Sequence, residues 1–522
     1  MKLTNLIKKV GIKNYTTYGS DMAKVDENEV KKPTGKLVLV TAISPTKSGN
    51  GKTTVSIGLA EAINKYTGKT CALSLREPSM GPVFGLKGGA TGGGKSVVTP
   101  SDKINLHFTG DMHAITAANN LICACVDNAI FQNDPLDIDP ENIFINRCLD
   151  CNDRALRNII IGDKDHRREE HFVITPASEI MAILCLSKNF EDLHKNIGNL
   201  VVALSKKGKP ITVRDMGIAD AVTGLMSNAI NPNFVQTMYG TPAFVHGGPF
   251  ANIAHGASTI IATKMALSHS EFAVTEAGFG ADLGAEKFFD VVCKRLEKYP
   301  DVVVLIATMP ALKTHGDGDY KKGLANLQKH MDNLHKTFGA NLVVTVNKFA
   351  GDSEKEIADV IKYCESQGVP ACKCNAYNEG PRGAKALAEL VVAESAKKSK
   401  PHSLYNEKEV EVKEQIELVA KEIYGAGKVI FSEKAQEKLK FLKKYGYDHL
   451  PTVIAKTQYS LTADQNVLGA PKGFDFPITD IEIRTGAGFV VAVCGKQLLM
   501  PALPKVPNAN KMTLKGKDLT GV

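Results

Sequence analysis

Hydrophobic and polar positions in the first part of the chain follow two different periods. Residues 35–44 are almost continuously apolar and rich in valine, the pattern of a strand buried on both faces. After a polar loop, residues 55–69 carry apolar side chains at helical spacing, with a glycine near the end, where helices commonly stop. Residues 69–77 form a second apolar run. This order predicts a strand–loop–helix–strand unit, the beginning of a parallel sheet with helices on its faces.

The strand pattern returns later in the chain, each time beside helix-like sequence. Four further apolar runs carry it, at residues 243–247, 271–278, 301–309 and 341–349. Runs of this length that alternate with helical patterns are typical of a parallel sheet. They predict that the sheet begun near the N-terminus continues through these segments.

The loop between the first predicted strand and helix carries a phosphate-binding pattern. From Thr46 to Thr53 it matches GxxxxGK[ST] except at the first glycine, where Thr46 stands. In such loops the backbone N–H groups and the helix N-terminus face the phosphates, Lys52 reaches the outer phosphates, and the Thr53 hydroxyl binds magnesium. The alternative is a chance match in an ordinary turn. The residues expected to bind ATP here are Thr46, Lys47, Ser48, Gly49, Asn50, Gly51, Lys52, Thr53 and Thr54.

A glycine-rich segment from Gly85 to Gly94 is a second candidate for anion binding. Six glycines in this stretch argue against a regular element, and the exposed N–H groups suit phosphate, although a surface linker is the alternative. The residues expected to contribute are Gly85, Lys87, Gly88 and Gly89.

Arg76 ends the second predicted strand, where a parallel sheet presents functional groups. Its guanidinium can hold a carboxylate or a phosphoryl group through two hydrogen bonds, and a structural salt bridge is an equal alternative. His246 and His255 lie in a glycine-containing turn after the third strand, where they either serve anions and protons or are satisfied loop histidines. Glu276 and Asp282 follow the fourth strand and could serve magnesium or an amine-bearing substrate.

Asn347 and Lys348 directly follow the last of the predicted strands. A polar pair in this place resembles the base-recognition turn of many P-loop proteins, although the pair alone is a weak signal. At least five strand ends thus carry turns with charged or glycine residues, the layout of an active-site edge. The residues by themselves predict an ATP-using phosphoryl-transfer enzyme with an anionic second substrate.

These signals predict an α/β fold: a P-loop NTPase-like, mostly parallel sheet with helices on both faces, plus two smaller α+β domains. The nucleotide-binding domain is expected to comprise residues 1–104 and 216–400. The strand rhythm changes elsewhere, which predicts an inserted α+β domain at 105–215 and a C-terminal α+β domain at 401–522. The first 35 residues are polar and lysine-rich and predict a short helical arm.

Composition narrows the possible functions. Of the 522 residues 43% are hydrophobic and 23% charged, which excludes disordered, collagen-like and coiled-coil proteins. The net charge of +8 is spread along the sequence, which suits an enzyme with anionic ligands. Because aromatic residues are not interleaved with Lys and Arg, no nucleic-acid partner is expected.

The chain is expected to be cytoplasmic and without a membrane partner. No apolar run approaches the ~20 residues of a membrane span, and the N-terminus has no secretory signal pattern. The eleven cysteines are therefore expected to be reduced. The CxxC pattern at Cys148 and Cys151 leaves a zinc or redox site as an alternative to plain thiols, but no second pair at zinc spacing accompanies it.

Two blocks, REPSMGPVFGLKGGATGGG and TPAFVHGGPFANIAHG, are long and specific. With the P-loop and LPTVIAKTQYSL they resemble the formate–tetrahydrofolate ligases (10-formyltetrahydrofolate synthetases), and the resemblance runs from about Gly35 to Val506. Such ligases use ATP to phosphorylate formate, and an amine nitrogen of tetrahydrofolate then attacks formyl phosphate and releases phosphate. The resemblance implies this activity, with ATP, formate and tetrahydrofolate as ligands.

Further assignments come from the resemblance alone. It implies that Arg76 holds formyl phosphate, which makes Lys52 and Arg76 the expected catalytic residues. Phe349 and Phe279 are similar in position to aromatic residues that contact folate in the family. The resemblance also implies a homotetramer and, besides ATP and magnesium, activation by a monovalent cation.

The chain departs from the family's usual residues at several places. Asn50 replaces glutamate, Lys95 tyrosine, Pro310 arginine, Asp317 glycine and Ala350 proline. The family also stacks folate on a tryptophan near residues 375–377, whereas this chain has no tryptophan and places Asn375 and Tyr377 there. An alternative function is therefore a paralogue that binds ATP but has lost or changed the folate acceptor site. An unrelated P-loop ATPase is a third.

Overall fold

The computed structural model describes residues 1–47, 49–85, 90–132, 135–163, 166–495, 497, 499–516 and 518–521. Within these residues, one large sheet has the strand order β1–β2–β14–β15–β4–β16–β3–β17–β18–β19, and β5 and β6 join it beside β14. The first ten strands are β1 (Tyr15–Tyr18), β2 (Met22–Val25), β14 (Asn233–Thr237), β15 (Pro242–Val245), β4 (Cys71–Leu75), β16 (Phe272–Glu276), β3 (Lys36–Ala42), β17 (Val302–Ala307), β18 (Leu342–Asn347) and β19 (Ala371–Cys374). The added pair is β5 (Gly92–Gly93) and β6 (Ser96–Thr99).

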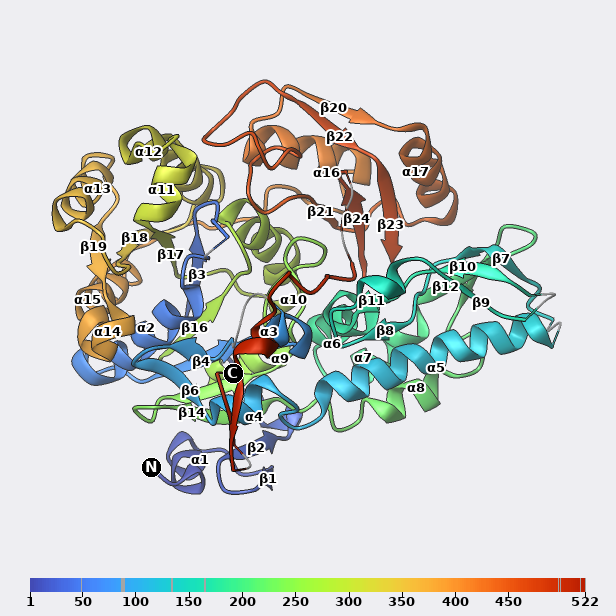
Figure 1. The fold of residues 1–522 in the computed structure, drawn as a ribbon, viewed down its shortest axis with the longest axis horizontal. Coiled ribbons are helices and arrows are strands. Elements are labelled where there is room, and N and C mark those ends of the chain that lie inside the picture. The colour runs from blue at the N-terminus through green and yellow to red at the C-terminus, as the bar shows by residue number, and fades with distance from the viewer. Residues whose placement is uncertain are drawn as a thin grey trace.

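Seven neighbouring strands, from β15 to β19 in the sheet order, run parallel to one another. The strands beyond β15 pair antiparallel. Because all seven parallel strands point the same way, their carboxyl ends meet at one edge of the sheet. Figure 1 shows this sheet with helices packed on both sides. The predicted α/β fold with a mostly parallel sheet is confirmed.

Successive residues of the parallel strands enter two separate cores, one on each face of the sheet. In β3, Leu37 and Leu39 belong to one core and Val38 and Val40 to the other, as the two-residue period of a strand requires. Helices α2 (Lys52–Tyr66) and α15 (Lys385–Glu394) cover one face, and α9 (Ile260–His269) and α13 (Glu354–Ser366) the other. Burial on both faces explains why these strands are continuously apolar.

Other helices accompany the large sheet. They are α1 (Leu3–Val10), α3 (Met80–Phe84), α4 (Ser101–Asn105), α10 (Cys293–Leu296), α11 (Met309–His315), α12 (Tyr320–Asp332) and α14 (Ala376–Glu379). A π-helical segment, Ala281–Ala285, follows the turn after β16.

The middle of the chain forms a smaller assembly outside the large sheet. Its helices are α5 (Asp111–Phe131), α6 (Glu179–Leu186), α7 (Phe190–Gly198) and α8 (Ala219–Leu225). Its strands are β7 (Ile138–Ile143), β8 (Cys148–Leu149), β9 (Ile159–Ile161), β10 (Arg168–Glu170), β11 (Val173–Ile174), β12 (Val201–Ser205) and β13 (Pro210–Thr212). The domain limits stay a prediction; α8, just beyond the limit at residue 215, packs against α5 and α7.

The last part of the chain packs above the sheet in Figure 1 and then crosses back over it. Its elements are α16 (Val412–Leu418), β20 (Lys428–Phe431), α17 (Glu433–Tyr445), β21 (Thr452–Ala455), β22 (Asp475–Ile478), β23 (Asp480–Arg484), β24 (Phe489–Val493), β25 (Thr513–Lys515) and β26 (Asp518–Thr520). Residues from the middle and last parts enter the same apolar core as Leu37 and Leu39, so the three parts share one buried interior.

Two expectations about local structure are wrong. The first 35 residues do not form only a helical arm, because β1 and β2 extend the large sheet through pairing of β2 with β14, and all four residues of β2 are buried. The glycine-rich segment also contains a regular element: Gly92 and Gly93 pair with β6, and a Cβ on Gly92 would lie 2.2 Å from the Ser96 backbone oxygen. Glycine allows this close approach of two strands.

Helix α5 is long and apolar enough to cross a membrane when judged by length and composition alone. It packs against α6 and α8 of this chain, as the core helices of globular proteins do. All eleven cysteines are free thiols. Cys148 is buried and Cys151 exposed, and burial raises the pKa of the Cys148 thiol to about 12, which suits neither thiolate chemistry nor metal binding there.

Candidate active site

The P-loop leaves β3 and enters α2 at the carboxyl edge of the sheet. Gly51 is the N-cap of α2 and has φ +72°, a left-handed conformation that glycine adopts without strain. A Cβ on Gly51 would lie 2.4 Å from the Asn347 Nδ2 atom. Both the backbone conformation and the close neighbour therefore require glycine at this position.

Asn50 has its side chain turned into the protein. Its Nδ2 donates to the Ile43 carbonyl at 2.8 Å, and its Oδ1 accepts from the Thr308 hydroxyl at 3.3 Å. Its carbonyl accepts from Asn347 Nδ2 at 3.0 Å. Asn50 thus ties the loop to the ends of β17 and β18, which leaves the backbone N–H groups of the loop as the part that can face phosphates.

Glu276, at the end of β16, joins the P-loop to the neighbouring strand end. Its Oε2 accepts from the Thr53 hydroxyl at 2.9 Å, and its Oε1 lies 3.5 Å from Arg76 Nη2. Arg76 also donates through Nη1 to the Pro249 carbonyl at 3.4 Å, while its buried Nε has no hydrogen-bond partner among the described residues. The Glu276 carboxylate thus links Thr53 of the P-loop to Arg76 after β4. The sequence indicated Glu276 only as a possible ligand of magnesium or of an amine.

Lys52 is held by the turn that follows Glu276. Its Nζ donates to the Phe279 carbonyl at 2.7 Å. Phe279 has φ +57°, a left-handed conformation that is uncommon for a bulky residue. The turn therefore presents its carbonyl to Lys52 at some conformational cost.

The base-recognition candidates lie at the end of β18, with two strands between β18 and the strand that precedes this turn. Asn347 contacts the P-loop, whereas Lys348 pairs with Glu354 and the Phe349 N–H donates to Asp352 at 2.8 Å. Since β3 and β17 separate β16 from β18, residues that follow the two outer strands lie about 14 Å apart at the sheet edge. Phe279 and Phe349 make no ring contact within the described chain.

The remaining predicted residues fall into two groups. Thr46, Lys47, Gly49 and Thr54 belong to the P-loop or the first turn of α2, whereas Gly85 lies apart from it, against Asn152 and Asn508. A Cβ on Gly85 would lie 2.5 Å from Asn152 Nδ2, so glycine serves close packing there. Four predicted residues, Ser48, Lys87, Gly88 and Gly89, lie outside the described residues.

Tyr377 occupies the region where the family's tryptophan is expected. It lies on α14, directly after β19, and is 54% exposed. Its carbonyl accepts from the Lys95 N–H at 2.8 Å, and a Cβ on Gly93 would lie 3.0 Å from its ring. Asn375 instead bonds to Glu379 at 2.7 Å. Of the two residues named from the sequence, Tyr377 is the one with an accessible ring.

The two histidines of the turn after β15 differ. His246 is a satisfied core residue that bonds to the Thr259 hydroxyl at 2.9 Å and the Ala229 carbonyl at 2.6 Å. His255 is fully buried, and neither ring nitrogen has a partner among the described residues. Burial, with Lys287 and Arg76 nearby, lowers the pKa of His255 to about 3, so its imidazole is neutral at physiological pH.

Sequence analysis missed the polar contacts that hold the start of the loop. Ser44 donates its N–H to His330 Nε2 at 3.0 Å, and its hydroxyl lies 3.1 Å from Asn326 Nδ2. Both partners lie on α12, which shows only an amphipathic pattern in the sequence. Burial lowers the pKa of His330 to about 4, which keeps Nε2 free to accept this hydrogen bond.

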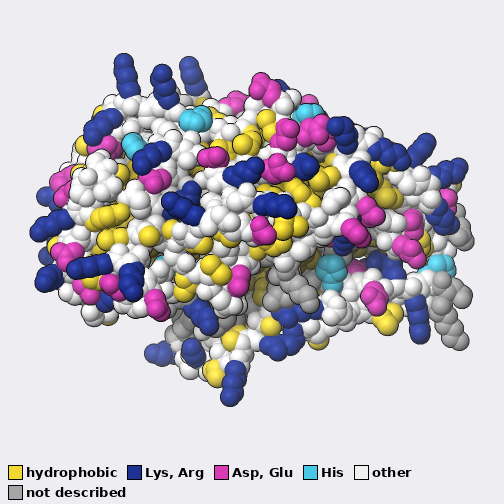
Figure 2. Space-filling view, turned by 90° about the horizontal axis from the view of Figure 1, so that it is seen from above, with side chains coloured by type: hydrophobic (Ala, Val, Ile, Leu, Met, Phe, Trp, Pro, Cys, Tyr) yellow, Lys and Arg dark blue, Asp and Glu magenta, His cyan; other side chains and the backbone are white. Residues whose placement is uncertain are grey.

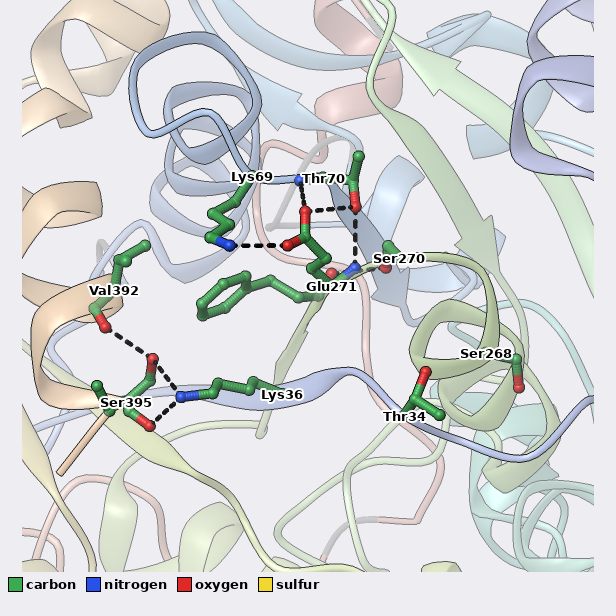
Figure 3. A pocket seen from close by; sticks show the side chains of 11 residues that line it. Thr34, Lys36, Lys69, Thr70, Ser268, Ser270, Glu271, Val392 and Ser395 are labelled. Atoms are coloured by element: carbon green, nitrogen blue, oxygen red, sulfur yellow. Dashed lines mark hydrogen bonds and ion pairs between the residues drawn. The ribbon is translucent and has the colours of Figure 1, made fainter. Parts of the chain in front are cut away.

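A cavity of about 510 Å³ lies at the opposite edge of the sheet, at the amino ends of β3 and β16. Figure 3 shows Lys36 beside Ser395 and Lys69 beside Glu271 in its wall. Its lining residues include none of the P-loop, and the polar groups in its wall are bonded to one another. The face in Figure 2 shows basic side chains mixed with acidic ones, which matches the dispersed charge of the sequence.

Comparison with known proteins agrees with the geometry. The sequence profile described as formate–tetrahydrofolate ligase matches residues 1–522. The chain belongs to the formate–tetrahydrofolate ligase family. The Campylobacter concisus (strain 13826) formate–tetrahydrofolate ligase is 50% identical over 512 residues, which are 95% of this chain and 92% of the relative.

Two further relatives carry the same name. The Thermotoga maritima protein is 50% identical over 514 residues, or 95% of this chain and 94% of the relative. The Petrotoga mobilis protein is 51% identical over 520 residues, or 96% of this chain and 93% of the relative. The family resemblance seen in the sequence is confirmed, and the chain is an enzyme of this ligase type.

Proposed function

We propose that this chain joins formate to tetrahydrofolate at the carboxyl edge of its large sheet, in two steps. In the first, a formate oxygen attacks the γ-phosphorus of ATP, and ADP leaves. In the second, an amine nitrogen of tetrahydrofolate attacks the carbonyl carbon of formyl phosphate, phosphate leaves, and the nitrogen loses its proton. The products are 10-formyltetrahydrofolate, ADP and phosphate.

One observation carries this proposal: Glu276 connects Thr53 of the P-loop to Arg76 of the next strand end. The residues expected to bind ATP and formate are therefore joined through Glu276 by one hydrogen bond and one ion pair. This places the acid held by Arg76 on the same strand edge as the phosphates held by Lys52.

Each residue of this unit has a role that follows from its chemistry. Lys52 and the loop N–H groups stabilise negative charge on the transferred phosphoryl group. Arg76 binds the carboxylate of formate and then formyl phosphate, since its planar fork matches both. Phosphorylation of formate replaces an oxygen that is a poor leaving group by phosphate, which is a good one.

Magnesium fits the oxygen atoms of Thr53 and Glu276, which lie 2.9 Å apart. Such hard oxygen ligands suit the ion, which usually keeps several waters and is shared with substrate phosphates. Among the described residues no cluster of three or more His, Cys, Asp or Glu side chains could hold a metal by itself. Magnesium would neutralise phosphate charge when bound.

The acceptor is proposed to bind beyond β18 and β19. The exposed ring of Tyr377 replaces the missing tryptophan as a stacking surface for the pterin, and Phe349 lies after the neighbouring strand. Phe279 lies nearer the phosphates. The paralogue that has lost the acceptor site gains no support, because the relatives at about 50% identity carry the ligase name over nearly their whole length.

Three broader expectations remain proposals: a homotetramer, activation by a monovalent cation, and a cytoplasmic location. The eleven free thiols support a reducing compartment.

The test is an assay of the purified chain with ATP, magnesium, formate and tetrahydrofolate. We expect 10-formyltetrahydrofolate to form only when all of these are present, with one ADP per product. ATP binding without product would contradict the ligase function and favour the altered paralogue. Omitting potassium or ammonium tests the cation, and light scattering of the same sample tests the tetramer.

A further inference from the structure

The turn that holds Lys52 is itself held from the last part of the chain. Asp282 lies three residues after Phe279, and a Cβ on Gly280 would lie 2.5 Å from its Oδ1. The N–H groups of Leu283 and Gly284 donate to the Gly280 carbonyl at 3.1 and 2.9 Å. The Asp282 carboxylate is thus packed against the backbone of the turn that presents the Phe279 carbonyl.

Lys456, at the end of β21, reaches this carboxylate. Its Nζ lies 2.7 Å from Asp282 Oδ2, and neither side chain is exposed to solvent. Lys456 also donates to the backbone carbonyls of Thr457 and Ser460, and it lies 4.9 Å from the centre of the Tyr424 ring. Its ammonium therefore has three acceptors, and Asp282 is the one that lies outside its own loop.

The same loop of the last part makes a second contact beside the P-loop. The Gly469 carbonyl accepts from Asn326 Nδ2 at 2.7 Å, and Asn326 also bonds to Ser44 at the end of β3. Gly280 packs against Ser44 as well, since its Cβ would lie 3.4 Å from the Ser44 Cα. The last part of the chain thus contacts the turn at Asp282 directly and the start of the P-loop through Asn326.

A buried ion pair is a poor source of stability, because both charges must leave water and an apolar pair is often at least as stable. A buried pair is better suited to fix one arrangement of the groups around it. Here that arrangement includes Phe279 in its left-handed conformation, which costs energy unless its surroundings determine it.

We propose that Lys456 is a positioning residue of the ligase reaction. Through Asp282 it fixes the turn at Phe279 and Gly280, and so the place from which Lys52 meets the transferred phosphoryl group. Lys456 acts on phosphoryl transfer through another residue and touches neither substrate. This inference rests on the proposed function of the P-loop edge.

The test uses the full chain and compares Lys456→Met with the double variant Lys456→Met/Asp282→Asn. The double variant removes both charges of the pair, so it decides the question if the single variant does not fold. We expect the double variant to melt near the wild-type temperature, while kcat falls 10- to 100-fold. KM for formate and tetrahydrofolate should stay within threefold, since neither binding surface is changed.

Lys294→Met is the matched control. Lys294 pairs with Glu407 and donates to the Tyr405 carbonyl at 3.0 Å, so it also joins the sheet helices to the last part of the chain, away from the turn. The Lys294→Met variant should have a lower melting temperature than the wild type and an unchanged kcat. An equal fall of kcat in this variant would mean that docking of the last part, and not the turn, is what matters.

A second readout asks whether Lys456 acts through Lys52. In a Lys52→Ala background, the double substitution at 456 and 282 should cause less than a twofold further loss in the rate of ADP formation. Multiplied losses, or an unchanged kcat in the wild-type background, would overturn the inference. A wild-type chain that makes no 10-formyltetrahydrofolate would instead refute the proposed function, so the two failures are distinct.

Discussion

Two halves of the same sheet edge are built in different ways. The nucleotide half, made of the P-loop with Glu276 and Asn347, is fixed by buried hydrogen bonds such as that from Asn347 Nδ2 to the Asn50 carbonyl. The acceptor half, where we propose that tetrahydrofolate binds, comprises Phe349, Lys95 and Tyr377. It has a ring that is 54% exposed and a neighbouring surface ion pair between Lys348 and Glu354.

The difference reflects what each half must bind. Charge that develops on a phosphoryl group is stabilised by donors that are already in place, so the nucleotide half gains from rigid, buried contacts. A flat ring is bound by area and stacking, which tolerate exchange of one aromatic residue for another. On the proposed function, the Tyr377 ring therefore takes the place of a tryptophan, whereas the P-loop has little freedom to change.

The largest effect should come from Lys52→Ala. Removing the ammonium from a preorganised phosphate site is expected to lower kcat on the order of 10³-fold, while the fold is kept. Steady-state rates and thermal unfolding of the same sample measure both quantities. A rate within tenfold of the wild type would show that Lys52 does not act on the phosphoryl group.

The rigidity of the nucleotide half can be tested with two glycines that share one backbone conformation. Gly49 and Gly51 both have φ +72°, but only a Cβ on Gly51 meets a neighbour, at 2.4 Å from Asn347 Nδ2. Gly51→Ala should lower kcat/KM for ATP about 10²-fold, and Gly49→Ala less than about tenfold, since misplacing a catalytic group by about 1 Å has an effect of this size. Equal losses would mean that strain alone, and not the contact, limits the loop.

Lowering the pH should reduce the stability that His330 gives to the nucleotide half. The pKa of His330 is about 4 in the folded chain because of burial, with Asp282 opposing the shift and His315, Lys456 and Lys329 adding to it. In the unfolded chain a histidine pKa is about 6.5, so the unfolded state takes up the proton first as the pH falls. Stability from this residue is complete above about pH 6.5 and is lost toward pH 4, by about 2 kcal/mol between pH 7 and pH 5.

Urea unfolding of His330→Gln at these two pH values checks the sign. The variant should lose less stability on acidification than the wild type. The exposed His402 gives the control, since His402→Gln should leave the pH dependence unchanged. A wild-type pH dependence in His330→Gln would place the acid-sensitive group elsewhere.

The tolerance of the acceptor half predicts a smaller, selective effect at Tyr377. Tyr377→Ala should raise KM for tetrahydrofolate about tenfold, the size expected for one lost stacking contact, without changing KM for ATP. Tyr377→Trp should bind tetrahydrofolate at least as well as the wild type. If both variants behave like the wild type, the pterin does not stack on this ring.

The smallest effect concerns stability beside α11. Asp317 has φ +54°, where the family usually has glycine, so Asp317→Gly should stabilise the chain by about 0.5 kcal/mol. Nearby Asp319 is the N-cap of α12 and accepts from the Lys321 N–H. Asp319→Ala should destabilise by about 1 kcal/mol, so thermal unfolding should show opposite signs for the two variants.

The sequence predicts the sheet because its signals are local. The continuous apolar runs, the glycine spacing of the P-loop and the residues at strand ends each depend on a few neighbouring positions. β1, β2 and β14 are missed because strands of four or five residues have little pattern of their own and gain their stability from pairing.

The structure brings several predicted site residues to one edge of the sheet, but the sequence did not predict how they are connected. Thr53 and Arg76 are both expected from motifs, but their link through Glu276 depends on strand order, which periodicity does not reveal. Lys456 and His330 contact Asp282 and Ser44 from segments far away in the chain. Lys456 lies in a block that resembles the family, but neither residue has a pattern that indicates these contacts. For Asn50 the motif misleads. Its place in the P-loop indicates a contact with the ligand, but its side chain forms hydrogen bonds with Ile43 and Thr308 inside the protein.

The segment from Leu499 to Asn508 contacts residues that are synthesised long before it. The Asn508 N–H donates to the Gly85 carbonyl at 2.8 Å, and the Leu499 carbonyl accepts from Ile174 at 2.8 Å, where the segment crosses back in Figure 1. Domains form on the ribosome from the N-terminus onward. The P-loop thus leaves the ribosome well before Lys456 and Asn508, so a nascent chain carries the nucleotide loop before the residues that contact Asp282 and Gly85 have been made.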